Sequence, residues 1–374
     1  MTCGPGGVGK TTTAAALAAQ VARRHDVSVL VLTIDPAKRL ADALGLEGIG
    51  NDERQVDPAM LGDQARGRLF AAMLDTKQSW DALVRTHAKD QATAAQILSN
   101  PLYQNITGRF VQSHDYIAME RLFELHESGR YDLIVVDTPP TRNALDFLDA
   151  PERLADFFSS RLLRWLIAPY RSRVFNLASK PFTQVADRIL GAQFLADIAE
   201  FFFALQSMYD GFVARAKAVQ ALLRSDAVSF CVVSSLEMTP AREAEFFATE
   251  LTARGLDLGA IVFNKVLPAS LRDREALLTA QLLGERAAEL APVAEVDPQL
   301  AARVLREAAR SFIDFAALAQ AEERARRAFR AHCDLVVAAP YFGDDVADVE
   351  GLLRLGGVLL DGTEEPTAGP SMPD

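Results

Sequence analysis

The stretch GPGGVGKT at Gly4–Thr11 decides how this chain folds, because it fits the pattern G-x-x-x-x-G-K-T at every position. Glycines permit positive φ angles, so successive backbone N–H groups can turn inward toward an anion. A helix-forming run follows at once over Thr12–Arg24, and the positive end of that helix would face the same anion. The pattern predicts a phosphate-binding loop that opens a nucleotide-binding domain.

Each position of this loop has an expected role. Lys10 is expected to bridge the β- and γ-phosphates, and Thr11 to hold Mg²⁺ through its hydroxyl. Only Met1–Cys3 precede the loop, a stub of the strand that should lead into it, and we expect the rest of that strand to lie upstream. The remaining phosphate contacts are expected from Gly4, Gly6, Gly7, Val8, Gly9 and Thr12.

Strand-like and helix-like segments alternate after the loop. Short runs rich in Val, Ile or Leu, without polar alternation, are typical of parallel strands that helices cover on both faces. The sequence therefore predicts an α/β P-loop NTPase fold, with a mostly parallel sheet flanked by helices. The expected strands are Ser28–Ile34, Asp132–Asp137, Val228–Ser234, Ala260–Asn264 and Asp334–Ala338.

Long helical segments interrupt this alternation. We expect one ATPase domain over residues 1–360, with helical insertions at about 68–127 and 151–225, and a disordered tail at 361–374 that is rich in Pro, Gly and acidic residues. A further charged helical stretch covers 301–331. In the second insertion an apolar stripe has helical spacing, and we interpret most of its residues as core. The excess of Phe at 201–203 is also compatible with an exposed groove or a subunit interface. The stripe comprises Phe194, Ile198, Phe201, Leu205, Met208, Phe212 and Val219.

The composition narrows the class of protein. The net charge of -11 disfavours non-specific binding to nucleic acid or anionic lipid. The three cysteines form no CxxC pair, which argues against a disulfide scaffold or a zinc ribbon. No apolar stretch approaches membrane-spanning length and no signal peptide begins the chain, so we expect a cytoplasmic protein, with peripheral membrane contact left open. The arginines at 161, 164, 171 and 173 are interpreted as a solvated face.

Two aspartates follow expected strands. Asp35 precedes Pro36, and an Asp followed by Pro is an ordinary helix start in which the carboxylate caps the helix. Asp35 is also a candidate for orienting the water that attacks the γ-phosphate. Asp137 ends an apolar run and is expected to bind Mg²⁺ directly or through water. Lys10, Asp35 and Asp137 are the expected catalytic residues, and Thr11 and Asp137 the expected metal ligands.

Together, GGVGKTT at 6–12, TIDPAKRLADALG at 33–45, LIVVDTPPTRNALDFLDAP at 133–151 and IVFNKVLP at 261–268 resemble the ArsA-type ATPases. That family includes the arsenite-pump ATPase and the ATPase that targets tail-anchored membrane proteins. The resemblance implies ATP and Mg²⁺ as cofactors and a dimer that closes around two nucleotides. It assigns Asp35 to switch I, Asp137 to switch II, Asn264 to the neighbourhood of the adenine, and Pro340–Phe342 to a segment that closes over the base.

The chain departs from the family pattern in three places. The lysine that reaches across the family's dimer is replaced by Pro5, so we hypothesise slow turnover alone or pairing with a related subunit that supplies this cation. Switch II continues as Arg142-Asn143 in place of glycine-histidine, and Arg142 is either a substitute cation or an ordinary surface arginine. The cysteines that bind arsenite or zinc in family members have no counterparts, so neither activity is expected.

The leading hypothesis is an ATPase that acts as a dimeric conformational switch, either a homodimer or a heterodimer, and handles an apolar protein client or a partner. One alternative is a spatial organiser of the MinD/ParA-like class, which the acidic C-terminus disfavours because that class attaches through terminal amphipathic helices or basic residues. Another alternative is a low-turnover regulatory subunit, which the proline at position 5 favours.

Overall fold

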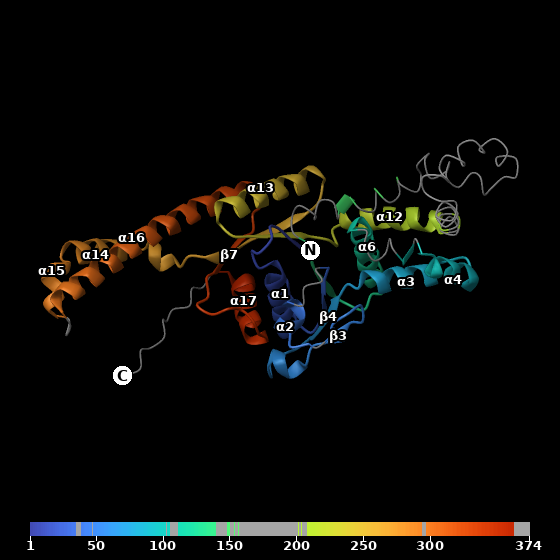
Figure 1. The fold of residues 1–374 in the computed structure, drawn as a ribbon, viewed down its shortest axis with the longest axis horizontal. Helices are drawn as coiled ribbons and strands as arrows, with labels where there is room; N and C mark the ends of the chain where they lie inside the picture. The colour runs from blue at the N-terminus through green and yellow to red at the C-terminus, as the bar shows by residue number, and fades with distance from the viewer. Residues whose placement is uncertain are drawn as a thin grey trace.

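A mixed sheet forms the centre of the molecule (Figure 1). The computed structural model describes residues 1–34, 39–46, 48–101, 103–104, 111–139, 148–149, 153, 156, 201, 203, 208–293 and 297–362. Within these residues the sheet has eight strands in the order β3-β4-β2-β5-β1-β6-β7-β8, and every pairing is parallel except β3 with β4. The predicted α/β fold with a mostly parallel sheet is confirmed.

The strands occupy β1 (Thr2–Cys3), β2 (Ser28–Thr33), β3 (Arg54–Gln55), β4 (Arg68–Met73), β5 (Leu133–Asp137), β6 (Phe230–Ser234), β7 (Leu258–Val266) and β8 (Val336–Pro340). All the strands expected from the sequence are present, with small shifts at their ends. The short β1 lies in the middle of the sheet, between β5 and β6. The loop that follows β1 therefore emerges at the centre of the carboxyl edge of the sheet.

Strand β4 corrects the expected start of the first insertion. Residues 68–73 were assigned to a helical segment, but they pair along their whole length with β2. The sequence RLFAAM contains no β-branched residue, so it lacks the usual strand signal. Pairing with the fully buried β2 decides the conformation instead, since an unpaired buried strand would leave its backbone groups unsatisfied.

Helices cover both faces of the sheet. Neighbouring strand residues point to opposite faces, and Val135 and Val136 accordingly belong to different core clusters. On the first face lie α1 (Lys10–Arg24), α2 (Arg39–Ala43) and α17 (Val349–Asp361). Helices α1 and α17 approach closely at Gly356, where a Cβ would come within 2.4 Å of the carbonyl oxygen of Ala16. Helix α17 runs to Asp361, the first residue of the expected tail, and residues 363–374 lie outside the described part.

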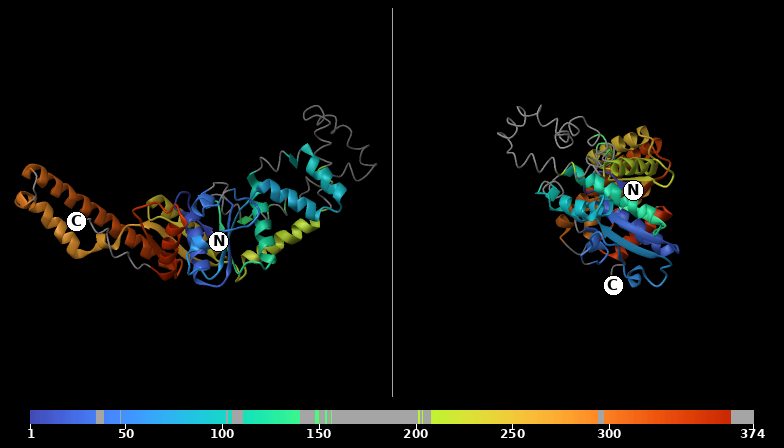
Figure 2. Two further views of the ribbon diagram at one scale, coloured as in Figure 1. Left: turned by 90° about the horizontal axis from the view of Figure 1, so that it is seen from below. Right: turned by 90° about the vertical axis from the view of Figure 1, so that its right-hand side faces the viewer.

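A second group of helices lies beyond one side of the sheet (Figures 1 and 2): α3 (Thr76–His87), α4 (Gln91–Ser99), α6 (Val111–Glu127) and α12 (Tyr209–Leu223). Their core is aromatic, with the ring of Phe212 5.9 Å from Tyr116 and 6.4 Å from Trp80. Four described residues of the predicted stripe, Phe201, Met208, Phe212 and Val219, are buried, which confirms their interpretation as core. Phe203 is 50% exposed. Phe194, Ile198, Leu205, Arg142 and the arginines at 161–173 lie outside the described residues.

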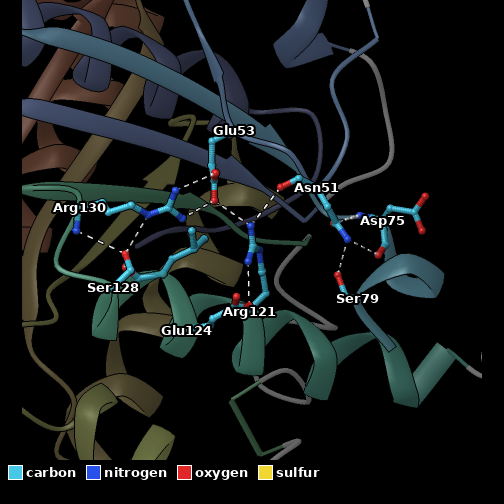
Figure 3. Close-up of polar contacts among 9 residues, drawn as sticks. Asn51, Glu53, Asp75, Ser79, Arg121, Glu124, Ser128 and Arg130 are labelled. Carbon is cyan, nitrogen blue, oxygen red and sulfur yellow. Dashed lines mark hydrogen bonds and ion pairs between the residues drawn. The ribbon is translucent and has the colours of Figure 1, made fainter. Parts of the chain in front are cut away.

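Polar contacts anchor these helices to the edge of the sheet (Figure 3). Glu53, next to β3, accepts hydrogen bonds from Arg121 of α6 at 2.8 Å and from Arg130 at 2.9 Å. Nearby, the amide of Asn51 donates to Ser79 of α3 at 2.8 Å. Because one carboxylate joins two guanidinium groups, the position of α6 is fixed relative to β3.

An arm of helices projects from the opposite side (Figures 1 and 2). It consists of α14 (Arg274–Glu285), α15 (Ala287–Leu290) and α16 (Pro298–Ala328), which follow the 3-10 turn Ala269–Arg272, while α13 (Met238–Ala253) packs beside β6 and β7. Asp297 caps α16 by accepting from the backbone of Leu300 at 3.2 Å, and Pro298 opens the helix. In the described part of the chain, no helix is both long enough and apolar enough to span a membrane.

Candidate nucleotide site

The glycine-rich loop joins β1 to α1 in the geometry that an anion site needs. Gly7 and Gly9 adopt φ angles of +79° and +92°, which side chains disfavour. Helix α1 begins at Lys10, with no side-chain cap at Gly9 and no acidic residue in its first turn. The N–H groups and the positive helix end are therefore available to an external anion.

Lys10 folds back over this loop. The residue is only 8% exposed, and its Nζ donates a hydrogen bond of 2.8 Å to the carbonyl oxygen of Pro5. Pro5 is itself buried. The ammonium group lies at the entrance of the loop, where it can exchange the carbonyl for a phosphate oxygen.

Thr11 and Asp137 meet next to Lys10. The Thr11 hydroxyl donates to Asp137 Oδ2 at 2.6 Å, and the hydroxyl of Thr33 donates to the same oxygen at 3.0 Å. Asp137 is 1% exposed at the end of β5, and Thr33 ends the neighbouring β2 in register with it. One hydroxyl and one carboxylate side by side fit Mg²⁺, which takes few protein ligands and completes its shell with phosphate oxygens and water. No cluster of His, Cys, Asp or Glu within the described residues suggests a metal held by protein alone.

Asn264 lies against the loop from the end of β7. It is 8% exposed, and its Nδ2 donates to the carbonyl oxygen of Val8 at 3.0 Å. A Cβ on Gly9 would come within 2.3 Å of the same nitrogen, so this position requires glycine. The next residue, Lys265, has φ +59°, and its N–H donates to Asn264 Oδ1 at 3.0 Å. Asn264 thus holds the phosphate loop and also forms part of the cavity wall.

A cavity of about 660 Å³ opens in front of Lys10, Thr11 and Asn264, whereas the buried Asp137 is not among its lining residues. Its volume is in the range of small-molecule and cofactor sites. Of the predicted site residues, Gly6, Gly7, Gly9, Lys10, Thr11, Thr12, Asn264, Pro340 and Phe342 line it. Gly4 and Val8 face the protein interior: a Cβ on Gly4 would collide with the Val233 carbonyl, and Val8 packs in a small apolar cluster. Asp35 lies outside the described residues.

Several wall residues were not predicted from the sequence. Thr138 follows Asp137, and its hydroxyl donates to the carbonyl of Thr2 at 2.9 Å, which fixes the start of the expected switch II. Phe342 stacks under the guanidinium of Arg354, whose carbon is 4.7 Å from the ring centre. A signal for Thr138 was its place directly after a predicted ligand. Tyr341 belongs to the segment 340–342 that the resemblance assigns to the base, and the quoted stretches 33–45 and 261–268 contain, without a predicted role, Leu40, Asp42, Ala43 and Lys265. The wall residues that carry no local motif are Ala15, Asp344, Asp345, Val346, Ala347 and Leu355.

Comparison with known proteins identifies the group to which this chain is related. A family model for anion-transporting ATPases, ArsA_ATPase, matches residues 1–287. The chain belongs to the ArsA family of ATPases. Similar proteins include ATPase get3 of Aspergillus terreus, 28% identical over 267 residues that cover 71% of this chain and 72% of that protein. ATPase GET3 of Malassezia globosa is 27% identical over 268 residues, 71% of each chain. ATPase get3 of Schizosaccharomyces pombe is 27% identical over 266 residues, 71% of this chain and 72% of its own.

The match to the ArsA family covers the phosphate loop, Asp137 and Asn264, because all of them precede residue 287. Helix α16 and the cavity wall at Pro340 and Phe342 lie beyond the matched range. The resemblance read from the sequence motifs is therefore confirmed as family membership, with the roles of individual residues still to be tested.

Proposed function

We propose that this ArsA-family chain binds Mg-ATP in the cavity around its phosphate loop and hydrolyses it as a dimeric conformational switch. The observation that carries the proposal is the 2.6 Å hydrogen bond between Thr11 and Asp137, with Thr11 lining the same cavity as Lys10. A P-loop ATPase needs a hydroxyl and a carboxylate at one point to hold Mg²⁺, next to a lysine for the β- and γ-phosphates.

The residues act in the following order. The phosphates take the N–H groups of Gly7–Thr12, and Lys10 exchanges the Pro5 carbonyl for phosphate oxygens. Thr11 and Asp137 would hold Mg²⁺, which would offset negative charge on the transferred phosphoryl group. A water oxygen forms a bond to the γ-phosphorus while the bond from that phosphorus to the β–γ bridging oxygen breaks. One proton of the water passes to an oxygen of the transferred phosphoryl group, giving ADP and dihydrogen phosphate. We assign the orientation of the water to Asp35, on the basis of the family resemblance.

Calorimetry with Mg-ATP tests the binding site directly. Lys10→Ala is expected to weaken binding at least about a hundredfold, because a charge-assisted contact to phosphate is lost in a desolvated position. Lys77→Ala is the matched control, since this lysine pairs with Asp81 on α3 and neither residue lines the cavity. Absence of binding by the wild-type protein, or equal binding by Lys10→Ala, would contradict the proposal.

The finer part of the proposal concerns partners. We infer a cytoplasmic protein that pairs with a second copy or a related ATPase subunit and acts on an apolar protein client, as the family resemblance implies. The proline at position 5 favours the related subunit, because it supplies no cation to the opposite nucleotide. Co-purification from the native cell, followed by ATPase assays of the isolated and paired chains, tests this: equal turnover alone and with every co-purified partner would contradict it.

A second candidate function is a subunit that binds ATP with little turnover. The burial of Pro5 supports it, since a catalytic cation contributed to the other subunit can raise the rate by orders of magnitude. Pro5→Lys is expected to raise turnover about tenfold or more if the missing cation limits the rate. Unchanged turnover, with Mg-ATP affinity preserved, would count against a limiting role for this position.

A further inference from the structure

The hydroxyl of Thr33 shares an acceptor with Thr11, the expected magnesium ligand. Thr33 Oγ1 donates to Asp137 Oδ2 at 3.0 Å, and Thr11 Oγ1 donates to the same oxygen at 2.6 Å. A carboxylate oxygen offers about two lone-pair positions, so these two donors together occupy the acceptor positions of Oδ2. The orientation of the Asp137 carboxylate therefore depends on Thr33 as well as on Thr11.

The sheet determines which face these two side chains share. Val31 and Val135 belong to one core cluster together with the alanines of α1, and alternate residues along a strand point to the same face. Thr33 lies two positions after Val31. Asp137 lies two positions after Val135 and is paired in register with Thr33. Both side chains consequently emerge side by side on the face that α1 covers, at the edge of the sheet where the phosphate loop lies.

The backbone around Thr33 is held by both neighbouring strands. The carbonyl oxygen of Thr33 accepts a hydrogen bond from the N–H of Leu74, directly after β4, at 3.0 Å. On the other side, the N–H of Ile34 donates to the carbonyl oxygen of Asp137 at 3.1 Å. Thr33 is also 1% exposed, and its branched side chain has a restricted choice of χ1 rotamers. The hydroxyl is thus placed by the strand ladder, and a group placed in this way can fix the side chain that it contacts.

From this geometry we infer that Thr33 is a positioning residue for magnesium: its hydroxyl holds the Asp137 carboxylate in the orientation in which it faces Thr11. The inference rests on the proposed function, because it concerns the Mg-ATP site. Thr33 is not among the lining residues of the cavity, so its role is to orient a metal ligand and not to bind the metal. Removal of a hydrogen-bond partner that orients a metal ligand typically lowers metal affinity roughly 10- to 100-fold.

The hydroxyl and the branched shape of Thr33 can be changed separately. Thr33→Val removes the hydroxyl and keeps the β-branched shape that suits a strand, whereas Thr33→Ser keeps the hydroxyl and loses the branch. If the hydroxyl positions Asp137, magnesium affinity follows the presence of the hydroxyl. If Thr33 only supports the strand, magnesium affinity follows the branch or does not change.

Calorimetric titration of the full chain with ATP, at a series of free Mg²⁺ concentrations, tests the inference. The measured quantity is the Mg²⁺ concentration that gives half of the full magnesium effect on ATP affinity. Thr33→Val is expected to raise this concentration about tenfold or more, and Thr33→Ala, a second variant without the hydroxyl, is expected to do the same. Thr33→Ser is expected to stay within about twofold of the wild type. ATP affinity in the presence of a chelator is expected to be equal in all four proteins, because Lys10 and the loop amides are unchanged.

Thr13→Val is the matched control. Thr13 lies on α1 and is 2% exposed, and its hydroxyl has no hydrogen-bond partner within the part of the chain that the structure describes. Its removal is expected to leave the magnesium dependence at the wild-type value. Wild-type magnesium dependence in Thr33→Val and Thr33→Ala, or an equal shift in Thr33→Ser or Thr13→Val, would overturn the inference and leave the proposed function standing. A wild-type protein that binds no Mg-ATP would overturn both.

Discussion

Asn264 offers a sharp test of how the site works, because the sequence and the structure give it different roles. The family resemblance implies a contact with adenine, whereas the structure has its Nδ2 donating to the Val8 carbonyl at 3.0 Å. If the residue acts by holding the phosphate loop, Asn264→Ala weakens every ligand that uses the loop, with or without a base.

The expected size follows from the burial of this contact. Removing one partner of a buried hydrogen bond costs roughly 1–3 kcal/mol, and since Asn264 also lines an open cavity, water can replace part of the contact. We therefore expect about 1–2 kcal/mol, a loss of roughly 5- to 30-fold in affinity. Asn264→Asp is expected to lose more, because an acceptor then faces the Val8 carbonyl and adds negative charge beside the phosphates.

Calorimetry with Mg-ATP and with magnesium tripolyphosphate, which has no base, separates the two roles. Holding of the loop predicts the same fold loss for both ligands. Asn51→Ala is the matched control, since it removes a hydrogen-bonded amide that contacts Ser79 near the sheet edge rather than the loop. A loss confined to ATP, with tripolyphosphate binding unchanged, would refute our reasoning and restore the adenine contact.

Three further changes have defined outcomes. Gly9→Ala is expected to reduce Mg-ATP affinity at least about a hundredfold in calorimetry, because φ is +92° and the added Cβ would meet Asn264 at 2.3 Å. Gly129→Ala is the control: its φ is +58° and a Cβ there would meet no atom within 4 Å, so it is expected to lower thermal stability without changing Mg-ATP affinity. Asp137→Asn is expected to reduce ATP affinity in magnesium to the level measured with a chelator, and a retained magnesium effect would remove Asp137 from the metal site. The hydrogen bond from Arg24 lowers the pKa of Asp361 below its usual 3.8, so the charged form is favoured in the folded state. Asp361→Asn should therefore melt slightly below wild type above pH 3.8. The difference should vanish as the pH falls through the lower folded-state pKa, since protonation then removes from the wild type the ion pair that the variant already lacks. A difference independent of pH would exclude this ion pair as its source.

The parts of the site that could be predicted are those encoded locally. Lys10 and Thr11 follow from one short motif, and Asp137 from an apolar run that ends in an acid. Thr33 donates to an oxygen of Asp137. It begins the quoted stretch 33–45, but its contact with Asp137 follows only from the parallel register of β2 with β5, which brings the two strand ends together. The hydrogen bond from Asn264 to Val8 likewise depends on packing between residues distant in the chain.

The fold shows the same division between local and long-range information. Strands rich in Val and Ile were predicted, while β4, with its Phe and paired alanines, owes its conformation to pairing with β2. The buried residues of α16 are all alanines, which carry little apolar signal in sequence, so the periodicity at 301–331 did not show that α14 packs there.

The arm and the nucleotide site are joined by the same two strands. Strand β7 ends at the site with Asn264 and leads into α14, and α16 returns through β8 to the cavity wall at Pro340. Two hydrogen bonds tie these connections together: Leu267 N–H donates to Glu322 of α16 at 2.9 Å, and Tyr341 N–H donates to the Val266 carbonyl at 2.9 Å. Because these hydrogen bonds join the end of β7 to α16 and to the residue after β8, the residues that follow Asn264 and the base of the arm belong to one hydrogen-bonded unit.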